Sequence, residues 1–169
     1  MRGKVWVITG LCVASVGAQA QQHDENERAQ LAKALKDTTI TLEKALLAAE
    51  HEGTPISAKF EVLKGKIELS VYAAKGGDRF AEINVDPKTG KISKVEEIKG
   101  GGDLAEARSQ SESFTRAKLS LRAATERAVK ANPGGRAVSV APNVRGGRPV
   151  ADVTLVAGNR FKTVTERLD

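Results

Sequence analysis

Two stretches of the chain repeat one order of residue types, and this repetition constrains the fold more than any other feature. Residues 40–62 read ITLEKALLAAEHEGTPISAKFEV, and residues 119–140 read LSLRAATERAVKANPGGRAVSV. In each stretch an apolar residue precedes a hydroxyl residue, Thr41 or Ser120, which is a favoured helix N-cap. Apolar residues then recur at helical spacing until turn residues follow. The pattern therefore predicts two copies of a helix that leads into strands.

Beyond each set of turn residues the apolar spacing changes from helical to alternating, which is typical of half-buried antiparallel strands. The first copy predicts strands around residues 58–62, 67–71, 81–85 and 92–95. The second copy predicts strands around residues 138–140, 151–155 and 164–168, with no counterpart of the fourth strand. The expected fold class is α+β, with two tandem units that each pack one helix on an antiparallel sheet.

The loop between the third and fourth expected strands, VDPKTGKISKV at residues 85–95, contains the residue types of a ligand-binding loop. A phosphate-binding loop needs glycine where Val85 stands, and a calcium loop needs an oxygen ligand where Lys88 stands. A turn explains the residues better, because Asp86 accepts backbone hydrogen bonds, Pro87 fixes φ and Gly90 adopts positive φ. The loop is therefore expected to be a hairpin turn.

The first twenty residues have the parts of a secretory signal peptide. Arg2 and Lys4 precede an apolar run over residues 5–16, and an Ala-Gln-Ala sequence ends at Ala20. We expect cleavage after Ala20 and a periplasmic or secreted protein. The apolar run is shorter than the roughly 20 residues of a membrane-spanning helix, so no transmembrane segment is expected.

Removal of residues 1–20 would leave a chain without thiols and with a moderate positive charge. Lipidation of Cys12 is not favoured, because Leu11 stands where a small residue is expected. Of 27 Lys and Arg residues, Arg2 and Lys4 would be lost, which leaves 25 against 21 Asp and Glu, a net charge of +4. Aromatic side chains for base stacking are few, which argues against nucleic acid as a partner.

The rest of the chain divides into four segments. Residues 21–38 have leucines at helical spacing and predict a leading helical segment. Residues 39–98 are the first unit, residues 99–117 a polar, glycine-interrupted linker with a helical later half, and residues 118–169 the second unit. Each unit alone is near the size at which one core barely suffices, so contact between the units or a homodimer is expected.

The chain offers few groups for catalysis, and we predict no catalytic, cofactor-binding or metal-binding residue and no enzyme. His51 stands at the end of the first helix, where an imidazolium favours the helix dipole. Glu96, Glu97 and Asp152 are interpreted as solvated or turn-adjacent groups. One alternative is a square-planar copper or nickel site at a mature N-terminus beginning Gln21-Gln22-His23, although cyclisation of the glutamine would remove its amine.

Glycine pairs at residues 134–135 and 146–147 form a second motif with two interpretations. Arg136, Arg145 and Arg148 flank these pairs. Successive backbone N–H groups with nearby arginines could hold an anion. The favoured interpretation is that the pairs only connect helix to strand and strand to strand.

One helix followed by three or four antiparallel strands, with INVDPKTGKI at residues 83–92 and PGGRAVSV at residues 133–140, resembles the PepSY domain. This family is known from propeptides of secreted metallopeptidases and from bacterial cell-envelope proteins. The resemblance covers residues 39–98 and 118–169, although the second unit lacks the Asp-x-x-x-Gly-Lys closure and no peptidase domain follows either unit. It implies a binding or inhibitory module of the envelope.

The expected function is therefore that of a non-enzymatic exported protein that binds another envelope or secreted protein, for example a protease. The alternative is a small-ligand or metal-binding periplasmic protein. In a simple meander, residues 160–168 would lie at the edge of the sheet. An edge strand exposes unpaired backbone groups to which a partner strand can add.

Overall fold

The computed structural model describes residues 15–169, with side chains from Glu25 onward. The first half begins with helix α1 (Ser15–Ala34), a 3₁₀ turn (Leu35–Asp37) and helix α2 (Leu42–Ala49). Four strands follow: β1 (Thr54–Leu63), β2 (Lys66–Ala74), β3 (Phe80–Val85) and β4 (Ile92–Glu97). The second half contains helices α3 (Gly101–Phe114) and α4 (Leu121–Ala131) and strands β5 (Arg136–Arg145), β6 (Arg148–Ala157) and β7 (Arg160–Arg167).

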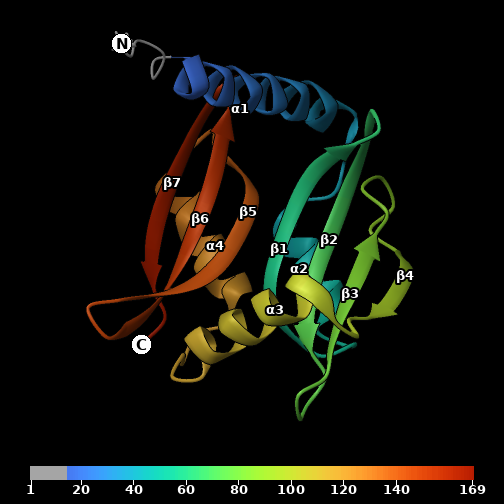
Figure 1. Cartoon of the computed structure of the whole chain (residues 1–169), viewed down its shortest axis with the longest axis vertical. Helices are drawn as coiled ribbons and strands as arrows, with labels where there is room; N and C mark the ends of the chain where they lie inside the picture. Colours follow the sequence, from blue (N-terminus) through green and yellow to red (C-terminus); the bar gives the residue numbers. More distant parts are fainter. Residues whose placement is uncertain (1–14) are drawn as a thin grey trace, which may run out of the picture.

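All seven strands belong to one antiparallel sheet in the order β4-β3-β2-β1-β5-β6-β7 (Figure 1). The predicted α+β class is confirmed. The strands of the two halves meet where β1 pairs with β5, and this seam contains two residue pairs, Ala58 with Val140 and Lys59 with Ser139. Strands β4 and β7 lie at the two edges, so the expected edge position of residues 160–168 is confirmed.

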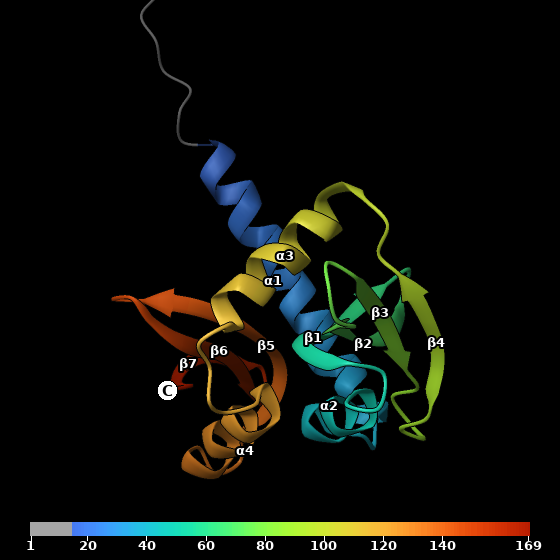
Figure 2. The ribbon, with the colours of Figure 1, turned by 90° about the horizontal axis from the view of Figure 1, so that it is seen from below.

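The helices cover the sheet unequally (Figure 2). Helices α2 and α4 lie on one face and contact each other, while α3 crosses the opposite face and contacts β1, β2, β5 and β6. Helix α1 lies across the ends of the strands (Figure 1). Beneath α2 and α4 is the main core, which buries leucines and alanines of both helices against the aliphatic side chains of the sheet.

Both helices on the covered face begin as the sequence predicts. The Thr41 hydroxyl accepts a hydrogen bond from the backbone N–H of Lys44 at 3.4 Å, and the Ser120 hydroxyl accepts one from Ala123 at 3.1 Å. These caps satisfy backbone donors that have no partner within the first helical turn. Each helix then leads into a strand with a bulge near its start, between Pro55 and Ser57 in β1 and between residues 137 and 139 in β5.

The segment expected to link the halves is mainly helical. Helix α3 occupies most of residues 99–117, and it begins inside the glycine run, with Gly100 as a cap that makes no side-chain hydrogen bond. Its Ala107 is fully buried against the sheet. Packing therefore stabilises a helix that its own sequence supports weakly.

The predicted export signal lies mostly outside the described residues, because residues 1–14 are not among them. The backbone of α1 includes residues 15–20 and continues through the expected cleavage position. Cleavage after Ala20 therefore stays a prediction. Within residues 15–169 no helix combines the length and the apolar character needed to cross a membrane.

Candidate functional site

The face of the sheet opposite α2 and α4, which we call the open face, is covered by α3 only near its centre. There a small apolar cluster is formed by Ile56, Phe80 and Ala107, with Tyr72 and Leu104 packed against it. On either side of α3 the open face presents mainly polar side chains. Antiparallel sheets often leave one face to solvent, so this surface is the one available for contacts.

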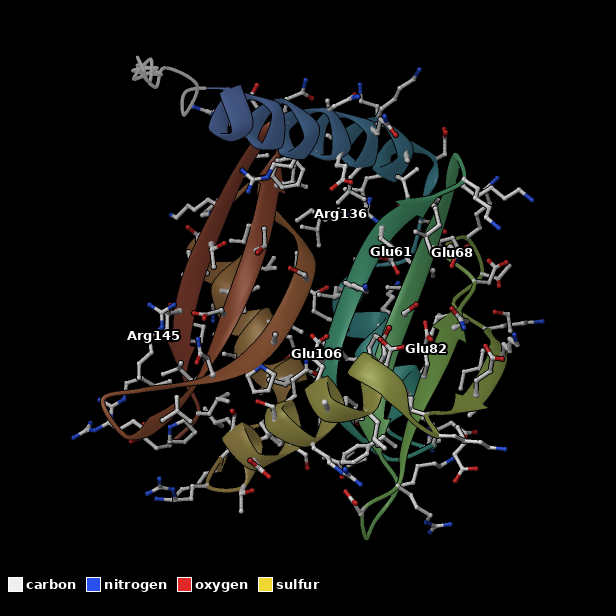
Figure 3. All side chains as sticks on the ribbon, in the orientation of Figure 1. Glu61, Glu68, Glu82, Glu106, Arg136 and Arg145 are labelled. Carbon is white, nitrogen blue, oxygen red and sulfur yellow. The ribbon has the colours of Figure 1, made fainter. Side chains whose placement is uncertain are left out.

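Four glutamates from four strands lie on the open face, and we call Glu61, Glu68, Glu82 and Glu96 the carboxylate row. Glu82 is opposite Tyr72, which packs against α3, and Glu68 is four residues before Tyr72 on the same strand. Side chains two or four residues apart on a strand share one face. Glu61 is opposite Glu68, and Glu96 is opposite Glu82 (Figure 3 shows Glu61, Glu68 and Glu82).

The carboxylate row contains two pairs of like charges placed directly across neighbouring strands, an arrangement that destabilises a sheet. Each pair has one nearby cation: Lys59 lies 3.0 Å from Glu61, and Lys94 lies 2.8 Å from Glu96. The side chain of Glu68 forms no ion pair with any residue from 25 to 169. A negative field therefore remains over β1–β3.

Two hollows adjoin the carboxylate row. A shallow one of about 550 Å³ lies over β2, β3 and β4, and its lining includes Glu68, Glu82 and Glu96. A smaller one of about 170 Å³ lies between α3 and strands β1, β2 and β5. In its wall the Ser57 hydroxyl donates to Gln110 at 2.7 Å, and the Gln110 amide donates to Glu106 at 2.9 Å.

The carboxylates near Tyr72 affect the pKa of its phenol. Burial first, and then the charges of Glu82, Glu61, Asp103 and Glu106, together raise the pKa of its phenol to about 12. The phenol should therefore stay protonated about two pH units above the usual value of about 10. The stability linked to this shift is present below pH 10 and is lost as the pH rises from about 10 to about 12.

We expect ultraviolet titration of Tyr72, the one tyrosine of the chain, to give a midpoint near pH 12. Replacing Glu82 with glutamine removes the charge that raises the pKa of Tyr72 most and should lower that midpoint. The matched variant Glu126→Gln, on helix α4 at the opposite face of the sheet, should leave the titration midpoint of Tyr72 unchanged. A midpoint near pH 10 in the folded wild-type protein would contradict the described environment.

On the open face of the second half of the sheet, the carboxylate of Asp152 is fully paired. Asp152 accepts hydrogen bonds from Thr165 at 2.7 Å, from Asn143 at 3.1 Å and from Arg145 at 2.9 and 3.0 Å. Burial alone would raise the pKa of the Asp152 carboxyl, but these hydrogen bonds outweigh it and hold the pKa below its usual value. The adjacent hydroxyls of Thr154 and Thr163 bond each other at 3.1 Å.

The arginines beside the glycine pairs are not free to hold an anion. The Arg136 guanidinium donates to the carbonyl oxygens of Leu35 at 2.8 Å and Ile40 at 2.7 Å, and also to the Thr38 hydroxyl. Its Cζ lies 5.3 Å from the centre of the Phe60 ring. Burial lowers the pKa of Arg136. Figure 3 shows Arg136 between β5 and β1, where it ties the two halves together.

The other two arginines are also engaged by carboxylates. Arg145 pairs with Asp152 at 2.9 Å, and Arg148 lies 4.0 Å from Asp169. The glycine pairs therefore act as connections, which was the favoured interpretation. The structure does not bring Arg136 and Arg145 together, because they stand at opposite ends of β5.

The loop at residues 86–91 is the turn that the sequence predicts. One Asp86 carboxylate oxygen accepts from the backbone N–H of Lys88 at 2.9 Å and of Thr89 at 2.7 Å. These bonds, that of Thr89 above all, lower the pKa of Asp86. Gly90 has a φ of 74°, the left-handed conformation that glycine adopts readily.

The histidines and acidic groups considered for catalysis do not converge. His51 is exposed in the turn after α2, and the side chain of His23 lies outside the described side chains. Glu97 is on the opposite side of β4 from Glu96. Among the described residues no three His, Cys, Asp or Glu side chains are grouped so that they could hold a metal ion.

The carboxylate row was not singled out from the sequence, although one signal was present. The two-residue turn at Lys64 and Gly65 pairs Leu63 with Lys66 and so places Glu61 opposite Glu68 by counting outward. The contribution of α3 had no comparable signal, because its polar sequence does not indicate which surface it covers.

Comparisons with known proteins give no family for the chain. No protein-family profile matches it, and no curated protein matches it. One solved structure is similar, a protein of Clostridium difficile 630 described as a "putative lipoprotein", with 10% sequence identity and a TM-score of 0.41. The match covers 73% of this chain and 82% of that protein. At this level of similarity it carries no argument about function.

Proposed function

We propose that this chain is an exported, non-enzymatic protein that binds another envelope or secreted protein, for example a protease, across the open face of its sheet. The carboxylate row carries the proposal. Like charges directly opposite one another cost stability unless a partner of opposite charge covers them. Glu68, which has no ion-pair partner among residues 25–169, and Glu82 offer such a surface.

The shape of the surface favours a macromolecule over a small ligand. Small-molecule sites are usually enclosed pockets of about 300–1,000 Å³. The hollow beside α3 is about 170 Å³, and the larger hollow over β2–β4 is shallow and lined by charged side chains. Strands held by a packed core on the other face provide a rigid support on which side chains keep their positions.

Two sequence features support the exported, binding role. The signal-peptide pattern of residues 1–20 directs export, and the resemblance of residues 39–98 and 118–169 to the PepSY domain points to a binding or inhibitory module. The scarcity of nucleophile and base pairs supports a role without catalysis.

Site-specific photocrosslinking in the exporting cell tests the proposal. A photoreactive residue at Glu68 or Thr154, both on the open face, should yield adducts with a partner protein. The same photoreactive residue at Lys44 on α2 or at Arg127 on α4 should yield no adducts. Both positions are exposed, on the helices that cover the other face of the sheet. Adducts from the helix side alone, or no adducts from any position, would refute the proposal. Intact-mass analysis of the exported chain checks the removal of residues 1–20.

A further inference from the structure

Within residues 15–169, strand β7 has one side without a pairing partner. It pairs with β6 over eight residue pairs, and the other side is the edge of the sheet (Figure 1). The Leu168 N–H donates to the Pro149 carbonyl at 3.1 Å, so residues 168 and 149 form a hydrogen-bonded pair. Because such pairs alternate along an antiparallel ladder, the N–H and C=O groups of residues 161, 163, 165 and 167 point outward.

Two copies of β7 placed antiparallel to each other bring complementary residues opposite one another. Residues 161–167 read FKTVTER and centre on Val164. In an antiparallel pair of two such strands, Lys162 of one faces Glu166 of the other, and Thr163 faces Thr165. Phe161 faces Arg167 in the same register. Opposite charges and paired hydroxyls are favourable cross-strand neighbours. Phe161 and Arg167 already have partners within the chain, in Arg28 and Asp169.

We propose that two copies of this chain pair through β7, antiparallel, about a two-fold axis at Val164, so that their sheets join into one of fourteen strands. In this register the outward backbone groups of Thr163 and Thr165 meet each other and complete their hydrogen bonds. Val164 meets its own copy as a non-hydrogen-bonded pair. The interface is isologous, so it closes at two copies.

The charges on β7 distinguish it from the other edge strand. Lys94 and Glu96 on β4 already pair with each other at 2.8 Å. On β7, Lys162 donates to the neutral amide oxygen of Asn132 at 2.7 Å. Glu166 forms no ion pair with any residue from 25 to 169. Lys162 and Glu166, two charges of opposite sign, therefore lie on the same face of β7 and have no charged partner among residues 25–169.

The two halves of the chain are already joined by antiparallel pairing of two edge strands. Strands β1 and β5 pair antiparallel at the edges of the two halves, and α2 and α4 then lie on the same face. Pairing of β7 with its copy repeats this arrangement. It also places both open faces on one side of the joined sheet.

A charge-swap series on the purified exported protein tests the pairing. Light scattering after gel filtration should give twice the monomer mass for the wild type. Lys162→Glu and Glu166→Lys should each weaken the dimer roughly tenfold or more, because each opposes like charges twice per dimer. The double variant should restore it. The corresponding variants on β4, Lys94→Glu and Glu96→Lys, are the controls and should leave the dimer intact. Circular dichroism should confirm the fold of every variant.

A disulfide at the two-fold axis tests the register. Opposed residues of a non-hydrogen-bonded pair have Cα atoms about 4.5 Å apart, within the range of a disulfide. Val164→Cys should therefore form covalent dimers on mild oxidation, whereas Thr163→Cys, which faces Thr165, should not. A monomeric mass at all concentrations up to about 1 mM, loss of the dimer on the β4 swap, or no rescue in the β7 double variant would overturn the proposal.

Discussion

Replacing Arg136 with leucine should lower the free energy of unfolding by about 2–4 kcal/mol, because several charge-assisted hydrogen bonds are lost together. The guanidinium binds the carbonyls of Leu35 and Ile40 and lies over Phe60. The Nε of Arg136 is buried without a hydrogen-bond partner among the described residues. This cost offsets part of the stabilisation that the other hydrogen bonds of the guanidinium provide. Leucine fills similar space but removes the donor of the Ile40 carbonyl, whereas the Leu35 carbonyl keeps its hydrogen bonds from Thr38.

Denaturant unfolding followed by circular dichroism measures this change. Arg145→Leu is the matched control, since Arg145 is on the same strand but its ion pair is at the surface. Exposed pairs contribute about 0–1 kcal/mol. Equal losses for the two variants would show that Arg136 does not tie the halves together.

A second large effect is expected in the core of the first half. Leu46 on α2 is fully buried, and Leu46→Ala should destabilise the fold by about 2–5 kcal/mol through lost burial and the cavity left behind. The adjacent Leu47 is 49% exposed, so Leu47→Ala should change stability by less than about 0.5 kcal/mol. Thermal and denaturant unfolding of the two single variants checks this contrast, and similar losses would contradict the assigned faces of α2.

Local features of the fold could be predicted because they depend on neighbouring residues. The caps at Thr41 and Ser120 and the turn at Asp86 rest on contacts within a few positions. Alternating apolar residues also indicated the strands. These signals established the α+β class and the edge position of residues 160–168.

The joining of the halves could not be read in the same way. The seam rests on two residue pairs between strands distant in sequence, and neither Ala58 nor Val140 differs from an ordinary strand residue. Helix α3 begins in a glycine run that signals a linker. In both cases tertiary packing decides the outcome over local preference.

The candidate site was predictable in part. Counting outward from the turn at Lys64 gives the pairing of Glu61 with Glu68. The pairing of Glu82 with Glu96 cannot be counted from the loop, because a register shift follows Asn84. The role of Arg136 also escaped prediction, since its partners precede it by about a hundred residues.

The narrow seam also has a consequence for how the chain folds as it is made. Ala58 and Val140, which meet across the seam, are 82 residues apart. At about 5–20 residues per second, β1 is complete roughly 4–16 s before the synthesis of β5 is finished. During that interval β1 is itself a bare strand edge, on which a neighbouring nascent chain could pair in place of β5. The growing chain is therefore most exposed to misassembly before its second half arrives.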